Sequence, residues 1–159
     1  MATDLAHEAS IPNPALQSLS VLIGEWATVG THFLIPGTTF HGRTVFDWIE
    51  GGAFLRMRSE IEEAGIPSGI TIFGTDDVLG QLFLLYFDER GVSRRYDASF
   101  EGNILKWWRN APGLSQRYSH TLSDDGRTLL GKGEMSEDGT TWQRDLDLTY
   151  QRASELDRV

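Results

Sequence analysis

Short segments in which apolar and polar residues alternate fill the chain from residue 22 onward. Alternation with a period of two is typical of strands that bury one face, and the segments are separated by Gly, Asp, Asn and Pro, as hairpins are. About ten strands are predicted. They span residues 22–34, 42–50, 53–62, 69–75, 80–87, 92–100, 104–110, 114–122, 127–135 and 140–151.

The separators between these strands are nearly all of hairpin length, so consecutive strands should pair antiparallel. An open row of strands would leave two edges that invite aggregation, and closure into a barrel removes them. The sequence shows no long crossover connection of the kind that a Greek-key sandwich needs. It therefore predicts an all-β fold, a ten-stranded antiparallel up-and-down β-barrel, with a β-sandwich as the alternative.

A short helix is predicted before the first strand. Asn13 can cap this helix, and Pro14 suits its first position because the missing N–H is not needed there. Leu16, Leu19 and Ile23 recur at helical spacing, so the helix should present one apolar face.

The largest side chain near the start of the first strand is Trp26, which follows the helix in the stretch LIGEW. It should pack beneath the helix and close one end of the barrel with its apolar ring. At 159 residues the chain is long enough for one domain with a buried core. We expect a flexible leader at 1–12, a single barrel domain at 13–152 and a polar tail at 153–159.

Two short loops predict which side chains face the barrel interior. A two-residue loop places its flanking residues opposite each other on one face of the sheet. Around the loop at 51–52, this rule predicts an apolar interior face. The members of that face are Thr44, Phe46, Trp48, Leu55, Met57 and Ile61. Around the loop at 102–103, it turns Trp108 outward and carries four side chains inward: Arg94, Tyr96, Trp107 and Arg109.

The last strand is placed by assuming a four-residue loop, SEDG, so that Met135 pairs with Thr140. Gly131 and Gly133 then make room for the side chains opposite them. This register predicts an outward Asp145 and five inward side chains. The inward residues are Trp142, Arg144, Leu146, Leu148 and Tyr150.

The predicted interior mixes aromatic rings with arginines and histidines. Buried arginines are costly unless they are paired, so a cavity that holds a ligand suits them better than a solid core. The residues predicted to bind this ligand are His32, Phe46, Trp48, Met57, Tyr96, Trp107, Arg109, Tyr118, His120, Trp142, Arg144 and Tyr150. Arg109 or Arg144 is the expected polar anchor, by charge-assisted hydrogen bonding. The alternative is that these arginines lie at the barrel mouth and pair with Asp or Glu.

Composition and charge narrow the partners. With 23 acidic and 14 basic side chains, the formal net charge is −9, which disfavours nucleic acid and anionic membrane surfaces. The chain has no cysteine, which excludes disulfides and thiolate chemistry. Because the start, MATDLAHEAS, lacks the features of a secretory signal, a cytoplasmic location is predicted.

Several segments resemble the calycins, the group of lipocalins and fatty-acid-binding proteins. Gly24-Glu25-Trp26 is similar to the lipocalin G-x-W at the start of the first strand. An ordered set of segments resembles an uncharacterised bacterial family of lipocalin-like proteins. These segments are LIGEW, FDWIEGGAFL, FGTDD, LLYFDERGVSRRY and GKGEMSEDGTTW. The resemblance covers roughly residues 20–152 and implies a barrel fold.

The opening GEWATVG is also similar to the G-x-W-x-G-x-G of nitrobindin, a ten-stranded barrel that binds heme, although Thr28 replaces a glycine. The nitrobindin heme ligand is a histidine in the last strand, where this chain has none. Only His32 or His120 could take its place. No cofactor is predicted, and heme is the one that this resemblance leaves open.

The predicted function is non-catalytic binding of a small, largely apolar ligand. The ligand could be anionic, because interior arginines would pair with a negative charge. Three alternatives stay open: a nitrobindin-like heme or redox protein, a small enzyme with His120 as base, and a filled structural barrel. No metal site is predicted, because no histidine has a partner at metal-ligand spacing. The chain could also form a homodimer that buries the outward Trp108, since an exposed Trp often marks an interface.

Overall fold

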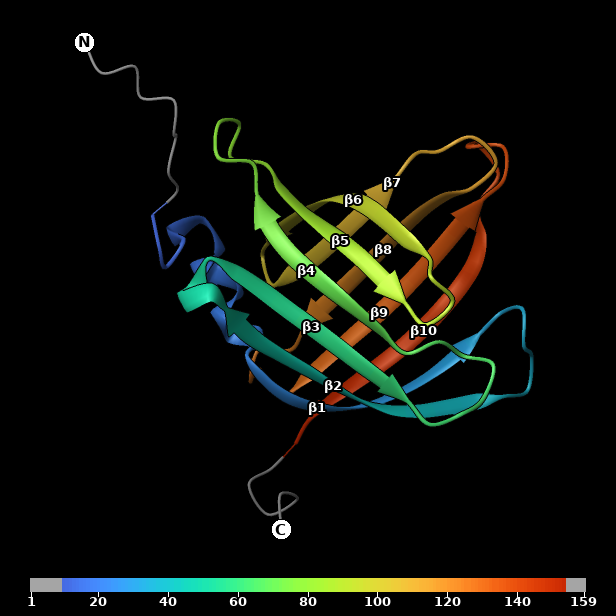
Figure 1. Ribbon diagram of the computed structural model, residues 1–159. Coiled ribbons are helices and arrows are strands. Elements are labelled where there is room, and N and C mark those ends of the chain that lie inside the picture. Colours follow the sequence, from blue (N-terminus) through green and yellow to red (C-terminus); the bar gives the residue numbers. More distant parts are fainter. Residues whose placement is uncertain (1–9, 154–159) are drawn as a thin grey trace.

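The computed structural model describes residues 10–153, and the ends outside this range include most of the predicted leader and tail. Ten antiparallel strands form a closed barrel in which each strand pairs with its neighbours in sequence and β1 pairs with β10 (Figure 1). The strands are β1 (Gly24–His32), β2 (Thr39–Ile49), β3 (Phe54–Ile61), β4 (Gly69–Thr75), β5 (Leu82–Asp88), β6 (Ser93–Glu101), β7 (Ile104–Arg109), β8 (Ser115–Leu122), β9 (Thr128–Ser136) and β10 (Gln143–Arg152). The predicted barrel is confirmed.

The element before β1 is a 3-10 helix, η1 (Pro14–Leu22), whose start is capped by the Asn13 side chain accepting a hydrogen bond from the Ala15 N–H. With three residues per turn, a 3-10 helix aligns every third side chain. Leu16, Leu19 and Leu22 are therefore its buried face, and Ile23 is only partly buried. The prediction of Ile23 on that face assumed α-helical spacing.

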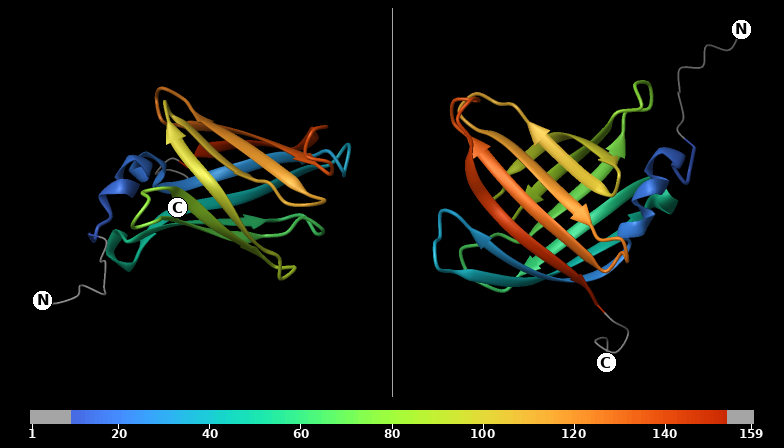
Figure 2. Two further views of the ribbon diagram at one scale, coloured as in Figure 1. Left: turned by 90° about the horizontal axis from the view of Figure 1, so that it is seen from above. Right: turned by 180° about the vertical axis from the view of Figure 1, so that it is seen from behind.

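One end of the barrel is closed by η1, which lies at that end in Figure 1 and in both views of Figure 2. Trp26 is fully buried there, and its indole N–H donates to the Leu22 carbonyl at 3.0 Å. The η1 leucines, Phe46, Leu55 and Phe73 belong to the same buried cluster. The role predicted for Trp26 is confirmed.

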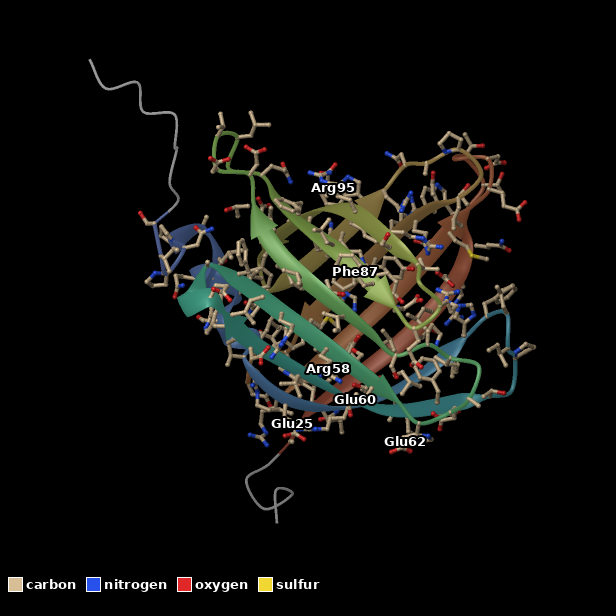
Figure 3. The ribbon with its side chains drawn as sticks, in the orientation of Figure 1. Glu25, Arg58, Glu60, Glu62, Phe87 and Arg95 are labelled. Atoms are coloured by element: carbon tan, nitrogen blue, oxygen red, sulfur yellow. The ribbon has the colours of Figure 1, made fainter. Side chains whose placement is uncertain are left out.

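The hairpin loops at 51–52 and 102–103 have the effects predicted for them. Trp48 pairs with Leu55, and Ala98 pairs with Trp107, so the predicted interior face of β2 and β3 is confirmed. The loop after β2 includes a short 3-10 turn, η2 (Glu50–Gly52), which keeps the same register. The outer face carries charged pairs such as Arg58–Glu60, which point away from the barrel together with Arg95 (Figure 3).

The register predicted for β10 is wrong at its start. Gln143, rather than Thr140, pairs with Met135, and a β-bulge interrupts the pairing between Arg144 and Leu146. A bulge inserts one extra residue and so reverses which side chains face inward beyond it. Leu146, Leu148 and Tyr150 face inward as predicted, whereas Asp145 turns inward and Arg144 outward.

Candidate functional site

A cavity of about 370 Å³ occupies the part of the barrel away from η1. This volume lies within the range of small-molecule sites, so the barrel is not filled by its own side chains. Hairpin loops lie at the end of the barrel opposite η1 (Figure 2), and the cavity extends to this end, where Leu34, Pro67 and Leu114 line it. Its apolar walls include Phe40, Met57, Ile61, Leu84, Trp107 and Leu148.

The inner end of the cavity, which borders the core beneath η1, contains three stacked or tilted rings. The rings of Trp107 and His120 stack with centroids 4.4 Å apart, and the Tyr150 ring lies 5.8 Å from that of His120. His120 is 1% exposed and Tyr150 2%. Gly131 allows this packing, because a Cβ there would lie only 2.7 Å from the His120 ring.

His120 has no hydrogen-bond partner at either ring nitrogen among the described residues. Burial lowers the pKa of His120 to about 3, because a charged imidazole would lose its hydration. The ring is therefore neutral at neutral pH. Both nitrogens are buried, so His120 does not present a base to the cavity in this arrangement.

The opposite part of the cavity contains a continuous chain of hydrogen bonds, which we call the mouth network. Gln116 is at its centre: its Oε1 accepts from the Tyr96 hydroxyl at 2.7 Å and from Arg94 at 3.3 Å, and its Nε2 donates to the Tyr118 hydroxyl at 2.9 Å. The Tyr118 hydroxyl in turn donates to Asp145 Oδ2 at 3.1 Å. Burial holds the pKa of Tyr118 well above its usual value, so this phenol stays a donor.

Asp145 ends the mouth network and ties it to β1. Asp145 is 5% exposed, and its Oδ1 lies 2.8 Å from His32 Nε2. The Leu34 N–H donates to the other ring nitrogen of His32 at 3.1 Å, so the proton of a neutral ring lies on Nε2 and faces Asp145. The bulge in β10 thus supplies an inward carboxylate with two donors.

Arg94 is the cation of the mouth network. It lines the cavity beside Tyr86, its cross-strand neighbour. Within residues 10–153, no ion pair joins it to a carboxylate, and its hydrogen-bond partners are Gln116 and Tyr96. The nearby Arg90 differs, because it pairs with Asp88 at 2.7 Å, and this pairing helps to lower the pKa of Asp88 to about 2. Arg94 therefore has donors left for an anion.

The structure brings together seven of the predicted ligand-binding residues on the cavity wall. They are His32, Met57, Tyr96, Trp107, Tyr118, His120 and Tyr150. Phe46 and Trp48 also lie inside but pack in or against the core beneath the cavity. Arg109 stacks over the Tyr96 ring with its guanidinium carbon 5.8 Å from the ring centroid, and it does not line the cavity.

Two predicted residues lie outside the barrel, and both predictions are wrong for the same reason. Trp142 precedes β10 and stacks under the guanidinium of the outward Arg117, at 3.9 Å. Arg144 is largely exposed and pairs with Asp147. The loop is longer than SEDG because Asp138 accepts hydrogen bonds from the Thr140 and Thr141 backbones and extends the turn.

Three residues of the mouth network, Arg94, Gln116 and Asp145, were missing from the predicted ligand-binding residues. Arg94 shares the parity of Tyr96 on β6, so it was predicted to face inward but was not chosen as the anchor. Gln116 shares the parity of Tyr118 and His120 on β8, so the alternation already contained its signal. Asp145 had no such signal, because strict alternation places it outside. The space beside Gly131 and Gly133 is also taken by different residues than predicted, since His120 and Tyr118 of β8 fill it.

Neither His32 nor His120 has the surroundings of a heme ligand, the role that the nitrobindin resemblance left open for them. A histidine that ligates a metal almost always donates its other ring N–H to a fixed partner. His120 has no such partner, and both nitrogens of His32 are already engaged by Asp145 and Leu34. These two residues, as arranged here, do not fit a histidine-ligated heme.

The fold and site define a closed ten-stranded antiparallel barrel with an internal cavity that is open at one end. The chain matches no family model and no curated protein. Among solved structures it is similar to Rv2717c from M. tuberculosis, with a TM-score of 0.64, 20% identity, and coverage of 92% of this chain and 100% of that one. This likeness supports the fold.

A protein of unknown function from the DUF3598 family of Nostoc punctiforme matches at a TM-score of 0.28 and 6% identity, over 84% of this chain and 97% of that one. That similarity is too low to support an argument. No helix within residues 10–153 is long and apolar enough to cross a membrane.

Proposed function

We propose that the barrel binds a small, largely apolar ligand with an anionic end, without catalysing a reaction. The observation that carries this proposal is the cavity of about 370 Å³ with apolar walls and one unpaired arginine at its open part. Sites for small molecules are typically concave and mostly apolar, with few polar groups that fix orientation.

Arg94, rather than Arg109 or Arg144, is the anchor that this geometry favours. Its guanidinium lines the cavity and keeps donors free, and a carboxylate could accept them in the paired geometry that suits arginine. Asp145 does not compete for Arg94, because its oxygens accept from His32 and Tyr118. The mouth network also fixes Gln116, which holds Arg94 in place.

The apolar part of the ligand would lie along the wall made by Trp107, Leu84 and Met57. Each buried methylene contributes about 0.8 kcal/mol of transfer free energy, so a chain of several methylenes could supply most of the affinity. We do not assign a catalytic role, because no described histidine presents a free ring nitrogen to the cavity.

Two measurements test this function. Native and denaturing mass spectra of freshly purified protein would reveal a bound molecule as a mass that denaturation removes. Calorimetric titration with decanoate would then measure binding directly. Arg94→Gln should weaken decanoate binding about tenfold to a hundredfold, the worth of a charge-assisted hydrogen bond.

The matched control is Arg144→Gln, which removes an arginine that the sequence predicted as anchor but that lies outside the barrel. Its affinity for decanoate should equal that of the wild type. Loss of affinity in Arg144→Gln but not in Arg94→Gln would contradict the assignment of the anchor. Absence of both a bound mass and decanoate binding would contradict the proposed function.

A further inference from the structure

The polar groups of the two parts of the cavity differ in how well they are satisfied. In the mouth network, each polar side chain has a hydrogen-bond partner. At the inner end, the two nitrogens of His120 are fully buried and have no hydrogen bond to any described residue. The Tyr150 hydroxyl also has no hydrogen bond to a described residue, but it is not among the fully buried atoms, so it reaches the cavity. Buried polar groups are nearly always hydrogen-bonded, so the unpartnered His120 beside an unused Tyr150 hydroxyl needs an explanation.

An accident of packing does not explain Tyr150 well. A phenylalanine would fill the same space without leaving a hydroxyl that has no partner within the protein. Tyr150 is 2% exposed and lines the cavity, and its ring lies 5.8 Å from that of His120. The two side chains thus form one uncharged polar patch among the rings and leucines of the core.

We propose, on the basis of the function proposed above, that the ligand carries a second, uncharged oxygen group, which Tyr150 binds at the inner end of the cavity beside His120. A hydroxyl or carbonyl group fits, because the Tyr150 hydroxyl can both donate and accept a hydrogen bond. A second charged group does not fit, since the charged side chains on the cavity wall belong to its mouth: Arg90, Arg94 and Asp145.

The ligand class is therefore an amphiphile with a carboxylate at one end and a neutral oxygen at the other, separated by an apolar chain or ring. The two polar ends would fix the depth and direction of the ligand in the barrel. Arg94 would select the charged end and Tyr150 the neutral one.

Matched pairs of probes test this inference by isothermal titration calorimetry: octanoate, decanoate and dodecanoate, each against its ω-hydroxy counterpart. In a purely apolar inner end, the added hydroxyl would be buried without a partner and would weaken binding about tenfold or more. We expect the opposite for at least one chain length, with the ω-hydroxy probe binding as tightly as the plain alkanoate or more tightly.

Tyr150→Phe removes only the hydroxyl. It should weaken binding of the preferred ω-hydroxy probe about tenfold and leave the plain alkanoate unchanged or slightly tighter. The control is Tyr86→Phe, because the Tyr86 hydroxyl also belongs to a cavity-lining residue but is already bonded to Asp88 at 2.7 Å. It should change both affinities by the same factor. Unfolding curves and circular dichroism would verify that both variants are folded.

Failure of the inference and failure of the function give different results. If alkanoates bind but every ω-hydroxy probe binds tenfold more weakly in both the wild type and Tyr150→Phe, the inner polar group is wrong and the function stands. If no alkanoate or ω-hydroxy probe binds and no bound mass is found, both are overturned.

Discussion

The two ends of the barrel are built from different interactions. Beneath η1, Trp26 and the leucines of η1 form a dry, filled core, whereas the opposite end has a cavity bordered by the mouth network. Apolar burial is non-directional and rewards filling space, whereas hydrogen bonds and charges require particular partners at particular angles. The closed end therefore stabilises the fold, and the open end positions donors and acceptors without filling the space between them.

Arg152 shows how tightly the closed end is held. Its guanidinium lies over the Trp26 ring at 4.2 Å and donates to the carbonyls of Ile23 at 2.7 Å and Val21 at 2.6 Å. The end of the last strand is thereby fastened to the segment that begins the first. The open end relies instead on Asp145 and His32, which join the same two strands through side chains.

The largest effect on stability is expected from Trp26→Ala at the closed end. Removing this fully buried ring leaves a void and the Leu22 carbonyl without its donor, so the free energy of unfolding should fall by about 3–5 kcal/mol. Urea unfolding followed by circular dichroism measures this loss. If Trp26→Ala lowers the free energy of unfolding less than Asp145→Ala does, the closed end is not the part that chiefly stabilises the fold.

The second effect concerns pH and His120. Its pKa is about 3 in the folded protein, against an ordinary value of 6.5, so between these values the unfolded chain binds more protons. Stability should therefore fall as pH drops below 6.5, by about 1.4 kcal/mol for each pH unit, and the loss should end near the folded-state pKa.

The pH dependence is tested by comparing the wild type with His120→Phe in urea titrations from pH 7 to pH 4. In His120→Phe, the free energy of unfolding should lose the part of its pH dependence that His120 causes. Any change that the larger ring makes to the free energy of unfolding itself is the same at every pH and does not affect the slope. Identical slopes in the two proteins would show that His120 is not buried in its neutral form.

The third prediction addresses the open end. Asp145→Ala should lower the free energy of unfolding by about 1–3 kcal/mol, because Tyr118 and His32 lose the acceptor that they share. Hydrogen exchange should rise at the Leu34 amide, whose acceptor is the His32 ring. Unchanged exchange at Leu34 would mean that Asp145 does not hold His32 in place.

The smallest effect is expected on the outer face. Asp47 pairs with Arg56 at 2.5 Å, and both side chains are 39% exposed. Asp47→Ala should change the free energy of unfolding by about 1 kcal/mol or less, since exposed ion pairs are screened by water and salt. Urea unfolding at low and high salt measures it, and a cost equal to that of Asp145→Ala would remove the distinction between buried and exposed carboxylates.

The sequence alone determined the architecture, because local signals were sufficient. Alternation marks each strand, hairpin-length separators set the order of pairing, and two short loops set the parity of β2, β3, β6 and β7. Trp26 could be assigned to the closed end because it follows a helix with an apolar face. These signals also placed seven of the predicted binding residues on the cavity wall.

Tertiary structure alone decided how the polar groups of the site are connected and that Asp145 belongs to it. The bulge at Asp145 depends on how β10 pairs with β9, and a single extra residue exchanges Arg144 for Asp145 on the inner face. The mouth network joins residues from β1, β6, β8 and β10, so its hydrogen bonds exist only once the barrel is closed. Alternation and turn residues reflect interactions between neighbours in sequence, so they can be identified from the sequence. The register of the last hairpin and the hydrogen bonds of buried polar atoms depend on contacts across the whole barrel.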